Sequence, residues 1–456
     1  MSKAAKRLAP RVMHDRSNQS ARGRLRLRDI LGPGLITGAS DDDPSGIATY
    51  SQAGAQFGYG LGWTMLFSYP LMSAVQMISA RIGRTTGHGI AGNLSRYYPK
   101  PLTYSVVLLL LIANTINIGA DLGAMADAMA LVSNMHAGIF LVVFALFCAL
   151  AEVFMKYGHY VRVLKWLTLA LFAYVITLFL VRVPWGQALR GIVVPQFAIN
   201  QSSLTMIVAI LGTTISPYLF FWQASQEAEE VHNHRGEHPL KCDPLAGGTE
   251  LKRIELDTLA GMGASNLVAL AIILTTAATL HTHGITDIQT SAHAAEALRP
   301  IAGNYAAVLF ALGIVGTGLL AVPVLAGSAA YAFCEAIKRP VGLGRKPPRA
   351  KAFYGTIVAA TFLGALVNFT PINPIKALYW AAVINGVVAV PVMATMMMIS
   401  TRKSIMGVFT ITPGMVLLGW FATAIMALAA VETACLSVAG GGLPWTPDTR
   451  TRSGPP

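Results

Sequence analysis

The sequence predicts an all-α protein that crosses a membrane many times. Of its 456 residues, 54% are hydrophobic and 12% are charged, and the mean hydropathy is +0.55, whereas a soluble domain carries about 25% charged residues. The apolar residues come in long blocks, for example 139–151 and 306–330. With their weakly polar flanks, such blocks approach the roughly 20 residues that a helix needs to cross the hydrocarbon core. We therefore expect a bundle of membrane-spanning helices.

Eleven spans of this kind are expected. Their approximate bounds are 30–57, 59–81, 102–131, 138–156, 163–182, 203–229, 254–281, 304–335, 352–370, 376–399 and 408–437.

The positions of the basic residues support eleven spans. If the N-terminus is cytoplasmic and the loops alternate sides, 28 of the 34 Lys and Arg residues fall in the cytoplasm, which is the bias that membrane proteins show. This predicts a basic cytoplasmic tail over 1–28 and a periplasmic tail over 438–456, in the inner membrane of a bacterium. Because the charge lies in loops rather than on one face, we expect the lipid bilayer as partner and no nucleic acid.

Helices 1 and 6 are expected to be broken. The first contains Pro33 and Pro44 and the sixth contains Pro217, and proline removes a helix hydrogen bond. A break at membrane depth is tolerated only inside protein or along a cavity. Breaks at corresponding points of two five-helix halves indicate a transporter built from inverted repeats. The transmembrane domain, 29–437, then consists of repeats over about 29–182 and 203–399 and an extra helix over about 408–437.

Three consecutive carboxylates, Asp41, Asp42 and Asp43, stand at the break in helix 1. A central aspartate costs about 2.5–3.5 kcal/mol on insertion scales, so the run requires a cation, a proton or water. On one helix the three side chains would spread over about 200°. Asp43, just before Pro44, is best placed at the break. For Asp41 and Asp42 the alternative is a solvated position at the outer helix end.

Helix 3 carries a polar stripe of Asn114, Asn117 and Asp121, spaced so that all three share one face. A lone buried asparagine usually bonds to a neighbouring helix. A buried aspartate on the same stripe indicates a proton or ion path instead. We expect Asp121 and Asn117 to lie on such a path, together with Asp42.

Helices 6 and 10 offer oxygen ligands. Thr213, Thr214 and Ser216 surround the break at Pro217, where hydroxyls and freed carbonyls suit magnesium, calcium or manganese. Alternatively, the hydroxyls satisfy the helix's own freed carbonyls. Asn385 in helix 10 is either a ligand or a helix–helix hydrogen bond.

Other features indicate no second kind of chemistry. The run His232, His234, His238 and Cys242 resembles a weak metal site, although such a run is more often a solvated loop. The four cysteines imply no disulfide framework. The sequence lacks a Walker loop, a nucleophile elbow and a His-Glu-x-x-His motif. Nothing therefore nominates an enzyme, and we expect no prosthetic group.

Several motifs, in order along helices 1 to 10, resemble those of the Nramp divalent-metal transporters. They are Leu31–Ile36, Asp43-Pro44, Gln56–Tyr59, Ala80–Gly83, Ala120–Leu122, Ile210–Pro217, Asn373-Pro374 and Lys376–Leu378. The resemblance implies a LeuT-type fold with two inverted five-helix repeats. It also implies import of a divalent metal ion, which is the substrate, usually coupled to protons.

The chain departs from the family's pattern at several positions. The asparagine of the family's helix 1 motif is replaced by Gly46, although the aspartate remains. In helix 6 the methionine ligand has become Ser216, the following histidine Tyr218, and a second histidine Gln223. The glutamate that the family carries in helix 3 aligns with Ala124.

These departures predict a harder site. A thioether favours transition metals over magnesium and calcium, and the smaller side chains leave room for an ion that keeps several waters, as magnesium does. We expect a secondary transporter of divalent metal cations, shifted towards Mg²⁺ or Mn²⁺. The loss of the glutamate and both histidines puts proton coupling in doubt. Alternatives are the same fold carrying an organic cation, an amino acid or a metal chelate, and a relative that transports nothing.

The expected site residues follow from these arguments and the resemblance. The metal-binding set is Asp43, Ser40, Gly46, Thr213, Ser216 and Asn385. The proton or ion pathway is Asp121, Asn117 and Asp42. The gating residues near the break in helix 6 are Pro217, Tyr218 and Gln223.

Overall fold

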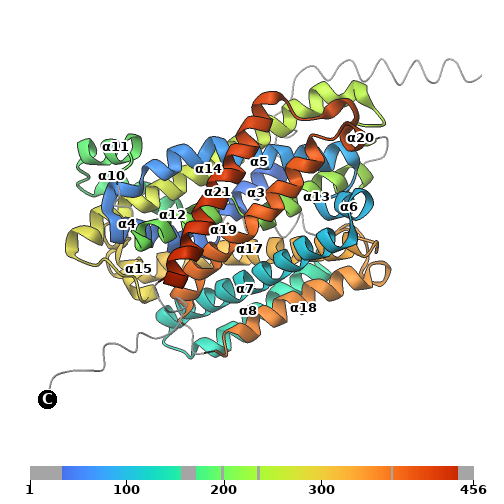
Figure 1. Cartoon of the computed structure of the whole chain (residues 1–456). Coiled ribbons are helices and arrows are strands. Elements are labelled where there is room, and N and C mark those ends of the chain that lie inside the picture. Colours follow the sequence, from blue (N-terminus) through green and yellow to red (C-terminus); the bar gives the residue numbers. More distant parts are fainter. Residues whose placement is uncertain (1–32, 156–170, 197–199, 234–236, 371–372, 440–456) are drawn as a thin grey trace, which may run out of the picture.

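The computed structural model describes residues 33–155, 171–196, 200–233, 237–370 and 373–439, which form helices joined by short connections (Figure 1). By length and composition, seven helices or helix pairs in this part of the chain can cross a membrane. They correspond to predicted spans 3, 4, 6, 7, 8, 10 and 11. The other four miss that criterion: span 1 is split, span 2 is richer in polar residues, span 5 is only partly described, and span 9 has 17 residues.

The helices of the first half follow the predicted order. They are α3 (Pro33–Asp41) and α4 (Pro44–Phe57) for span 1, α5 (Trp63–Thr86), α7 (Lys100–Ser133), α8 (Ala137–Phe154) and α10 (Phe172–Leu180) for spans 2 to 5. The predicted start of span 5, 163–170, lies outside the described residues, as does the tail 1–28. Two short helices, α6 (Ile90–Tyr97) and α11 (Trp185–Val193), lie in the connections.

The second half repeats the pattern. Its spans are α12 (Gln201–Thr214) with α13 (Pro217–Asn233), then α14 (Gly247–Thr279), α17 (Ala306–Ala336), α18 (Lys351–Val367) and α19 (Pro374–Ser400), followed by α21 (Pro413–Ala439). Short connecting helices are α15 (Ser291–Glu296), α16 (Arg299–Ala302) and α20 (Lys403–Met406). Both halves therefore begin with a helix that is interrupted, at residues 42–43 and 215–216.

The interrupted helices lie inside the bundle and unbroken ones surround them. Within the apolar window of α12–α13, 94% of the residues are buried, compared with 33% in α8 and 28% in α21. In Figure 1, α8 and α18 cover one side and α21 runs across another. Large apolar side chains on these outer helices are exposed, among them Val142, Leu146, Leu363 and Phe421. Exposed apolar surface of this extent indicates contact with lipid.

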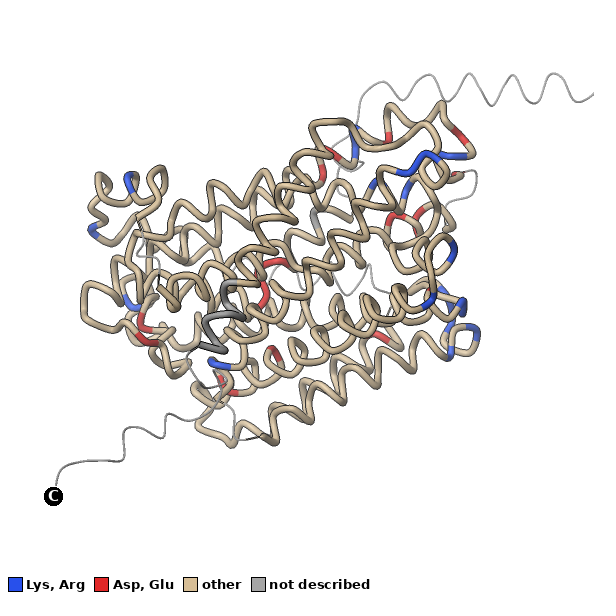
Figure 2. The backbone as a smooth tube through the Cα atoms, viewed as in Figure 1, with Lys and Arg blue, Asp and Glu red and all other residues tan. Residues whose placement is uncertain are grey.

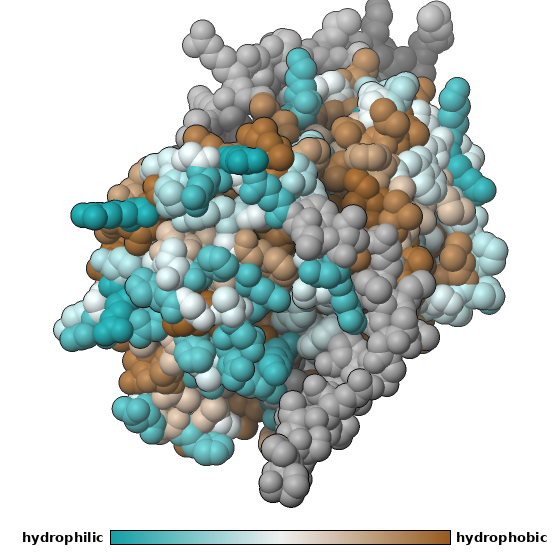
Figure 3. All heavy atoms as spheres, turned by 60° about the vertical axis from the view of Figure 1, so that its left-hand side comes forward, coloured by the Kyte–Doolittle hydropathy of each residue, from teal (hydrophilic) through white to brown (hydrophobic). Residues whose placement is uncertain are grey.

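Charge is distributed unevenly along the bundle. Figure 2 shows that the described Lys and Arg residues gather mostly at the end that carries α6 and α20, whereas the acidic residues between α3 and α4 lie near the middle. The opposite end, turned forward in Figure 3, carries hydrophilic side chains beside a hydrophobic flank. Two polar ends separated by an apolar belt are what a protein that spans a bilayer requires.

Glycines allow the interrupted helices to approach their neighbours closely. A Cβ on Gly38 of α3 would lie 2.7 Å from the Cα of Gly261 in α14. A Cβ on Gly212 of α12 would lie 2.8 Å from the Cα of Gly386 in α19. Such contacts between small residues are the usual way in which transmembrane helices pack without a hydrophobic driving force. Both broken helices are therefore held by backbone contacts.

We expect Gly212→Val to destabilise the protein, because the added carbons would enter the backbone of α19. Overpacking of this kind typically costs about 1–3 kcal/mol, which thermal unfolding of the purified protein in detergent would register as a lower melting temperature. Gly355→Val in α18 is the matched control, since a Cβ there meets nothing within 4 Å. Equal melting temperatures for the two variants would contradict this account of the packing.

Candidate functional site

The break in the first helix is organised around Asp43. The residue caps α4, and its Oδ1 accepts hydrogen bonds from the Gly46 backbone N–H at 2.7 Å and from the Ser45 hydroxyl at 2.6 Å. Pro44 occupies the first turn, where its missing N–H has no helical partner to lose. An aspartate cap followed by proline is a strong helix start, so this local sequence by itself ends α3 and begins α4.

The break in the sixth helix is organised differently. The Ser216 hydroxyl lies 2.9 Å from the Gly212 carbonyl oxygen and 2.7 Å from that of Thr213, and the Thr214 hydroxyl lies 2.9 Å from the Ile210 carbonyl oxygen. These hydroxyls satisfy the carbonyls at the end of α12, which is the alternative that the sequence left open for them. Pro217 then begins α13. In this structure Ser216 stabilises the break.

The two breaks meet at the second oxygen of Asp43. Its Oδ2 lies 3.0 Å from the Asn117 amide nitrogen of α7 and 3.2 Å from the Tyr218 hydroxyl of α13. The Tyr218 hydroxyl also lies 3.0 Å from the Ser40 carbonyl oxygen. The Asn385 amide of α19 donates to Asn117 Oδ1 at 3.4 Å. Four segments that are distant in the sequence therefore converge on one carboxylate.

This carboxylate is buried and fully engaged. Asp43 is 1% exposed, and its two oxygens face four donor groups, although the single hydroxyl hydrogen of Tyr218 is shared between Asp43 Oδ2 and the Ser40 carbonyl oxygen. The donors to Oδ1 come from the helix cap itself, whereas those to Oδ2 are the movable side chains Asn117 and Tyr218. An incoming group can therefore reach Asp43 most easily from the Oδ2 side.

Asp41 and Asp42 are buried as well, so the alternative of a solvated position is wrong. Both point to α14, where the Ser265 hydroxyl lies 2.6 Å from Asp41 Oδ2 and 3.1 Å from Asp42 Oδ1. The chain puts them in the core because α3 packs tightly on α14. Asp42 also lines a cavity of about 110 Å³ bordered by Ser265 and Phe172. Ser265 could not be found from the sequence, because a serine in a long apolar helix is common.

Asp121 lies on α7, one turn beyond Asn117, and is completely buried. Its carboxylate faces the backbone of Ser45 but makes no hydrogen bond of ordinary geometry among the described residues. The Thr213 hydroxyl and Asn385 Oδ1 are likewise buried without a partner there. A Cβ on Gly46 would lie 3.0 Å from the Thr213 hydroxyl oxygen. The breaks are thus bordered by polar groups in need of a ligand.

Among the described residues, the acidic groups around the breaks have no basic partner. The ion pairs of the described residues involve Arg84, Arg253 and Arg299, and none reaches Asp41, Asp42, Asp43 or Asp121. Four buried carboxylates without a basic partner are strongly disfavoured unless protons or cations neutralise them. The arrangement can therefore attract and hold positive charge.

The residues predicted to gate the site are all buried, but in different places. Pro217 starts α13, and Tyr218 belongs to the site itself through its contacts with Asp43 and Ser40. Gln223 lies five residues, or about one and a half turns, further along α13, where it accepts from Gln76 and donates to Thr258. It therefore ties α13 to α5 and α14. Asn114 donates to the Leu325 carbonyl of α17, as interhelical asparagines do.

An ionic cluster that the sequence analysis missed closes the basic end of the bundle. Arg253 of α14 pairs with Glu227 of α13 at 2.7 Å, and Arg84 of α5 pairs with Glu237 at 2.8 Å and Glu250 at 2.9 Å. The signal was present as charges within otherwise apolar helices, but their partners are far apart in the sequence. The cluster joins α13, the second half of the broken sixth helix, to α5 and α14.

The histidine-rich run does not form a metal site in the part of the chain that the structure describes. Among these residues no three His, Cys, Asp or Glu side chains are grouped closely enough to hold a metal ion. His234 lies outside the described residues, and Cys242 is exposed. His232 instead lies near His88, with ring centroids 6.4 Å apart.

Comparisons with known proteins agree with this geometry. The family model described as natural resistance-associated macrophage protein-like, Nramp, matches residues 34–435. The divalent metal cation transporter MntH of Yersinia enterocolitica is 29% identical over 297 residues, which cover 64% of this chain and 68% of that protein. MntH of Klebsiella pneumoniae is 27% identical over 309 residues, or 66% and 71% of the two chains.

The fold has counterparts among solved structures. The manganese transporter of Eremococcus coleocola, in complex with an aromatic bis-isothiourea substituted compound, superposes with a TM-score of 0.71 at 16% identity, covering 91% of this chain and 89% of that one. This similarity shows the LeuT-type fold, with helices 1 and 6 broken and five-helix repeats, that the sequence predicted.

The buried pair Arg253–Glu227 provides a test of the ionic cluster. Its side chains are 12% and 0% exposed, so Arg253→Ala would leave an uncompensated buried charge, which typically costs about 3–5 kcal/mol. Arg299→Ala is the matched control because its pair with Glu296 is 65% and 44% exposed and such pairs contribute about 0–1 kcal/mol. In thermal unfolding, the melting temperature should fall clearly for Arg253→Ala and stay close to that of the wild type for Arg299→Ala. A similar small decrease for both variants would show that the cluster does not stabilise the fold.

Proposed function

This chain belongs to the Nramp family, and from that premise we propose that it carries a divalent metal cation across the membrane, with Asp43 at the binding site. The family match and the similarity to proteins named divalent metal cation transporters support this proposal. The observation that carries it is the buried group of carboxylates at the breaks, which has no basic partner among the described residues.

The cation would enter from the Oδ2 side of Asp43. The helix cap holds Oδ1, so only Asn117 and Tyr218 can give way without unwinding α4. When the Tyr218 hydroxyl releases Ser40 and Asp43, two hard oxygen ligands become free together. Because Asn117 is on α7 and Tyr218 on α13, cation binding would change how the unbroken helices contact the broken ones, which is the coupling that alternating access needs.

The remaining ligands would come from both breaks. The Ser40 carbonyl, the unpartnered Thr213 hydroxyl, Ser216 and the free oxygen of Asn385 are the further candidates. We expected Gly46 among the metal ligands, but we now propose a supporting role for it. Its N–H orients the Asp43 carboxylate, and its lack of a side chain leaves room for Thr213. These are oxygen donors, which suit Mg²⁺ and Mn²⁺.

We place the ion pathway along Asp121 and Asp42. Asp121 continues the stripe from Asn117 and is unpartnered, and Asp42 is the carboxylate that borders a cavity. With Ala124, Tyr218 and Gln223 standing where the family has a glutamate and two histidines, these two aspartates are our candidates for carrying protons, although Asp41 and Glu152 are also buried carboxylates. We propose transport that depends weakly or not at all on a proton gradient.

The charge distribution supports one orientation in the membrane. The end with α6 and α20, where basic residues gather (Figure 2), would face the cytoplasm. The N-terminus would then lie in the cytoplasm and the C-terminus in the periplasm, in a bacterial inner membrane.

Replacing Asp43 by asparagine tests the binding site directly. Asparagine also caps helices well, so Asp43→Asn should fold while losing the charge. We expect Mg²⁺ and Mn²⁺ uptake into proteoliposomes to fall by at least about 100-fold, because even groups that only support a metal ligand are worth about 10–100-fold. Asp127→Asn is the control, since Asp127 lies outside the site and accepts from Ser291. Uptake that survives in Asp43→Asn would exclude this site.

The residue at position 216 tests the preference for hard ions. A thioether is softer than a hydroxyl, so Ser216→Met should raise Mn²⁺ uptake relative to Mg²⁺ in a competition assay. Ser216→Ala removes the hydroxyl without adding sulfur and should not produce this shift. If both variants change the ratio equally, the size of the side chain rather than its softness decides the preference.

Recording the internal pH during uptake would reveal any proton coupling.

A further inference from the structure

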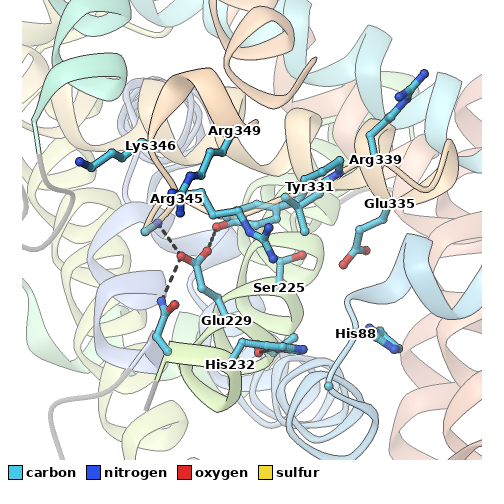
Figure 4. Close-up of a pocket in the computed structure, with 17 residues that line it drawn as sticks. His88, Ser225, Glu229, His232, Tyr331, Glu335, Arg339, Arg345, Lys346 and Arg349 are labelled. Carbon is cyan, nitrogen blue, oxygen red and sulfur yellow. Dashed lines mark hydrogen bonds between the residues drawn. The ribbon is translucent and has the colours of Figure 1, made fainter. Parts of the chain in front are cut away.

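A large pocket lies at the basic end of the bundle, away from the buried carboxylates. It has a volume of about 680 Å³ and is bordered by the end of α5, by α13, and by the end of α17 with the loop that leads to α18 (Figure 4). Four basic residues line it: Arg339, Arg345, Lys346 and Arg349. The size is within the range of about 300–1,000 Å³ that is typical of ligand sites.

The acidic residues of the pocket are already engaged by neutral donors. Glu229 of α13 accepts from the backbone N–H groups of Leu343 at 3.0 Å and Gly344 at 2.7 Å, and from the Tyr331 hydroxyl. Glu335 of α17 accepts from two backbone N–H groups of the segment that starts α6, each at 2.9 Å. These carboxylates hold the walls of the pocket together through neutral donors, and neither forms an ion pair with the four basic residues.

The basic side chains have no such partners. Among the described residues, none of the four makes an ion pair or a side-chain hydrogen bond. Four cations against two carboxylates leave a formal charge of +2 on the lining. The Ser225 hydroxyl also lines the pocket, 2% exposed and without a partner in the same part of the chain.

We propose that this pocket binds a phosphate-bearing anion. Arginine recognises phosphate through two parallel hydrogen bonds, and Figure 4 shows Arg345 and Arg349 beside Tyr331 and Glu229, whereas the side chains of Lys346 and Arg339 extend outward on either side. The pocket is larger than one phosphate group requires, which favours a phosphate ester. A lipid headgroup and a soluble cytoplasmic phosphate compound share this chemistry, and the experiment below separates them.

An occupant would connect α13 to the α17–α18 loop. Ser225 belongs to α13, the second half of the broken sixth helix, and can donate from its hydroxyl, whereas Arg345 and Arg349 belong to the loop. A bound phosphate would join the two through charge-assisted hydrogen bonds. The binding itself does not depend on the proposed function, so the two ideas can fail independently.

Calorimetry tests binding of soluble compounds to the full-length protein in nanodiscs of phosphatidylcholine. The soluble probes are pyrophosphate and ATP, and metal ions are absent. The lipid arm compares the melting temperature in phosphatidylcholine with that in phosphatidylcholine plus phosphatidylglycerol. Saturable binding of a soluble probe would assign a soluble ligand, and stabilisation by phosphatidylglycerol alone would assign a lipid. For a soluble probe, Arg345→Ala/Arg349→Ala should raise the dissociation constant by about tenfold or more for each lost charge-assisted contact. For a lipid, the same double variant should reduce the gain in melting temperature that phosphatidylglycerol produces.

Two controls distinguish the pocket from general attraction between charges. Arg345→Lys/Arg349→Lys keeps the charge and should retain part of the binding. Lys252→Ala/Lys403→Ala removes the same charge from exposed positions that do not line the pocket, and binding should stay at the wild-type level. The proposal is overturned if neither probes nor phosphatidylglycerol act on the wild type, or if the two alanine double variants weaken binding equally.

Discussion

The constraint on which the structure depends is the burial of a charged helix cap. The N-cap position of α4 fixes where Asp43 lies, and this end of α4 is inside a membrane-spanning bundle. A carboxylate in that position has to be surrounded by donors, and Asn117 and Tyr218 supply two of them from other helices. The convergence of α7, α13 and α19 on the break is thus a consequence of one residue.

The scaffold around the break makes this arrangement rigid on one side and adaptable on the other. Gly38 against Gly261 and Gly212 against Gly386 lock the broken helices to their neighbours through backbone contacts. The contacts to Oδ2 are made by single side chains, which can rotate without disturbing a helix. A site built in this way can change its ligands while the bundle remains intact, which a transporter needs at its centre.

The helix α13 links the centre of the bundle to its basic end. Tyr218 lies at its start, and Glu229 lies eleven residues later, a distance of about 16 Å along a helix. Between them Gln223 and Glu227 bond to α5 and α14. A movement of α13 as a whole would therefore also displace the ionic cluster and the loop that Glu229 holds.

The sequence by itself determined the helices, their order, the two breaks and the position of Asp43 at the first break, because hydropathy, proline and helix capping act over a few residues. Only the tertiary structure decided the partners: that Asp41 and Asp42 turn to Ser265, that Tyr218 belongs to the site, and that Ser216 bonds to its own helix. These contacts join residues up to more than 200 positions apart, and depend on how helices pack rather than on local composition. A pattern along the chain therefore shows which polar groups stand at the breaks, and packing determines which of them are buried and which meet.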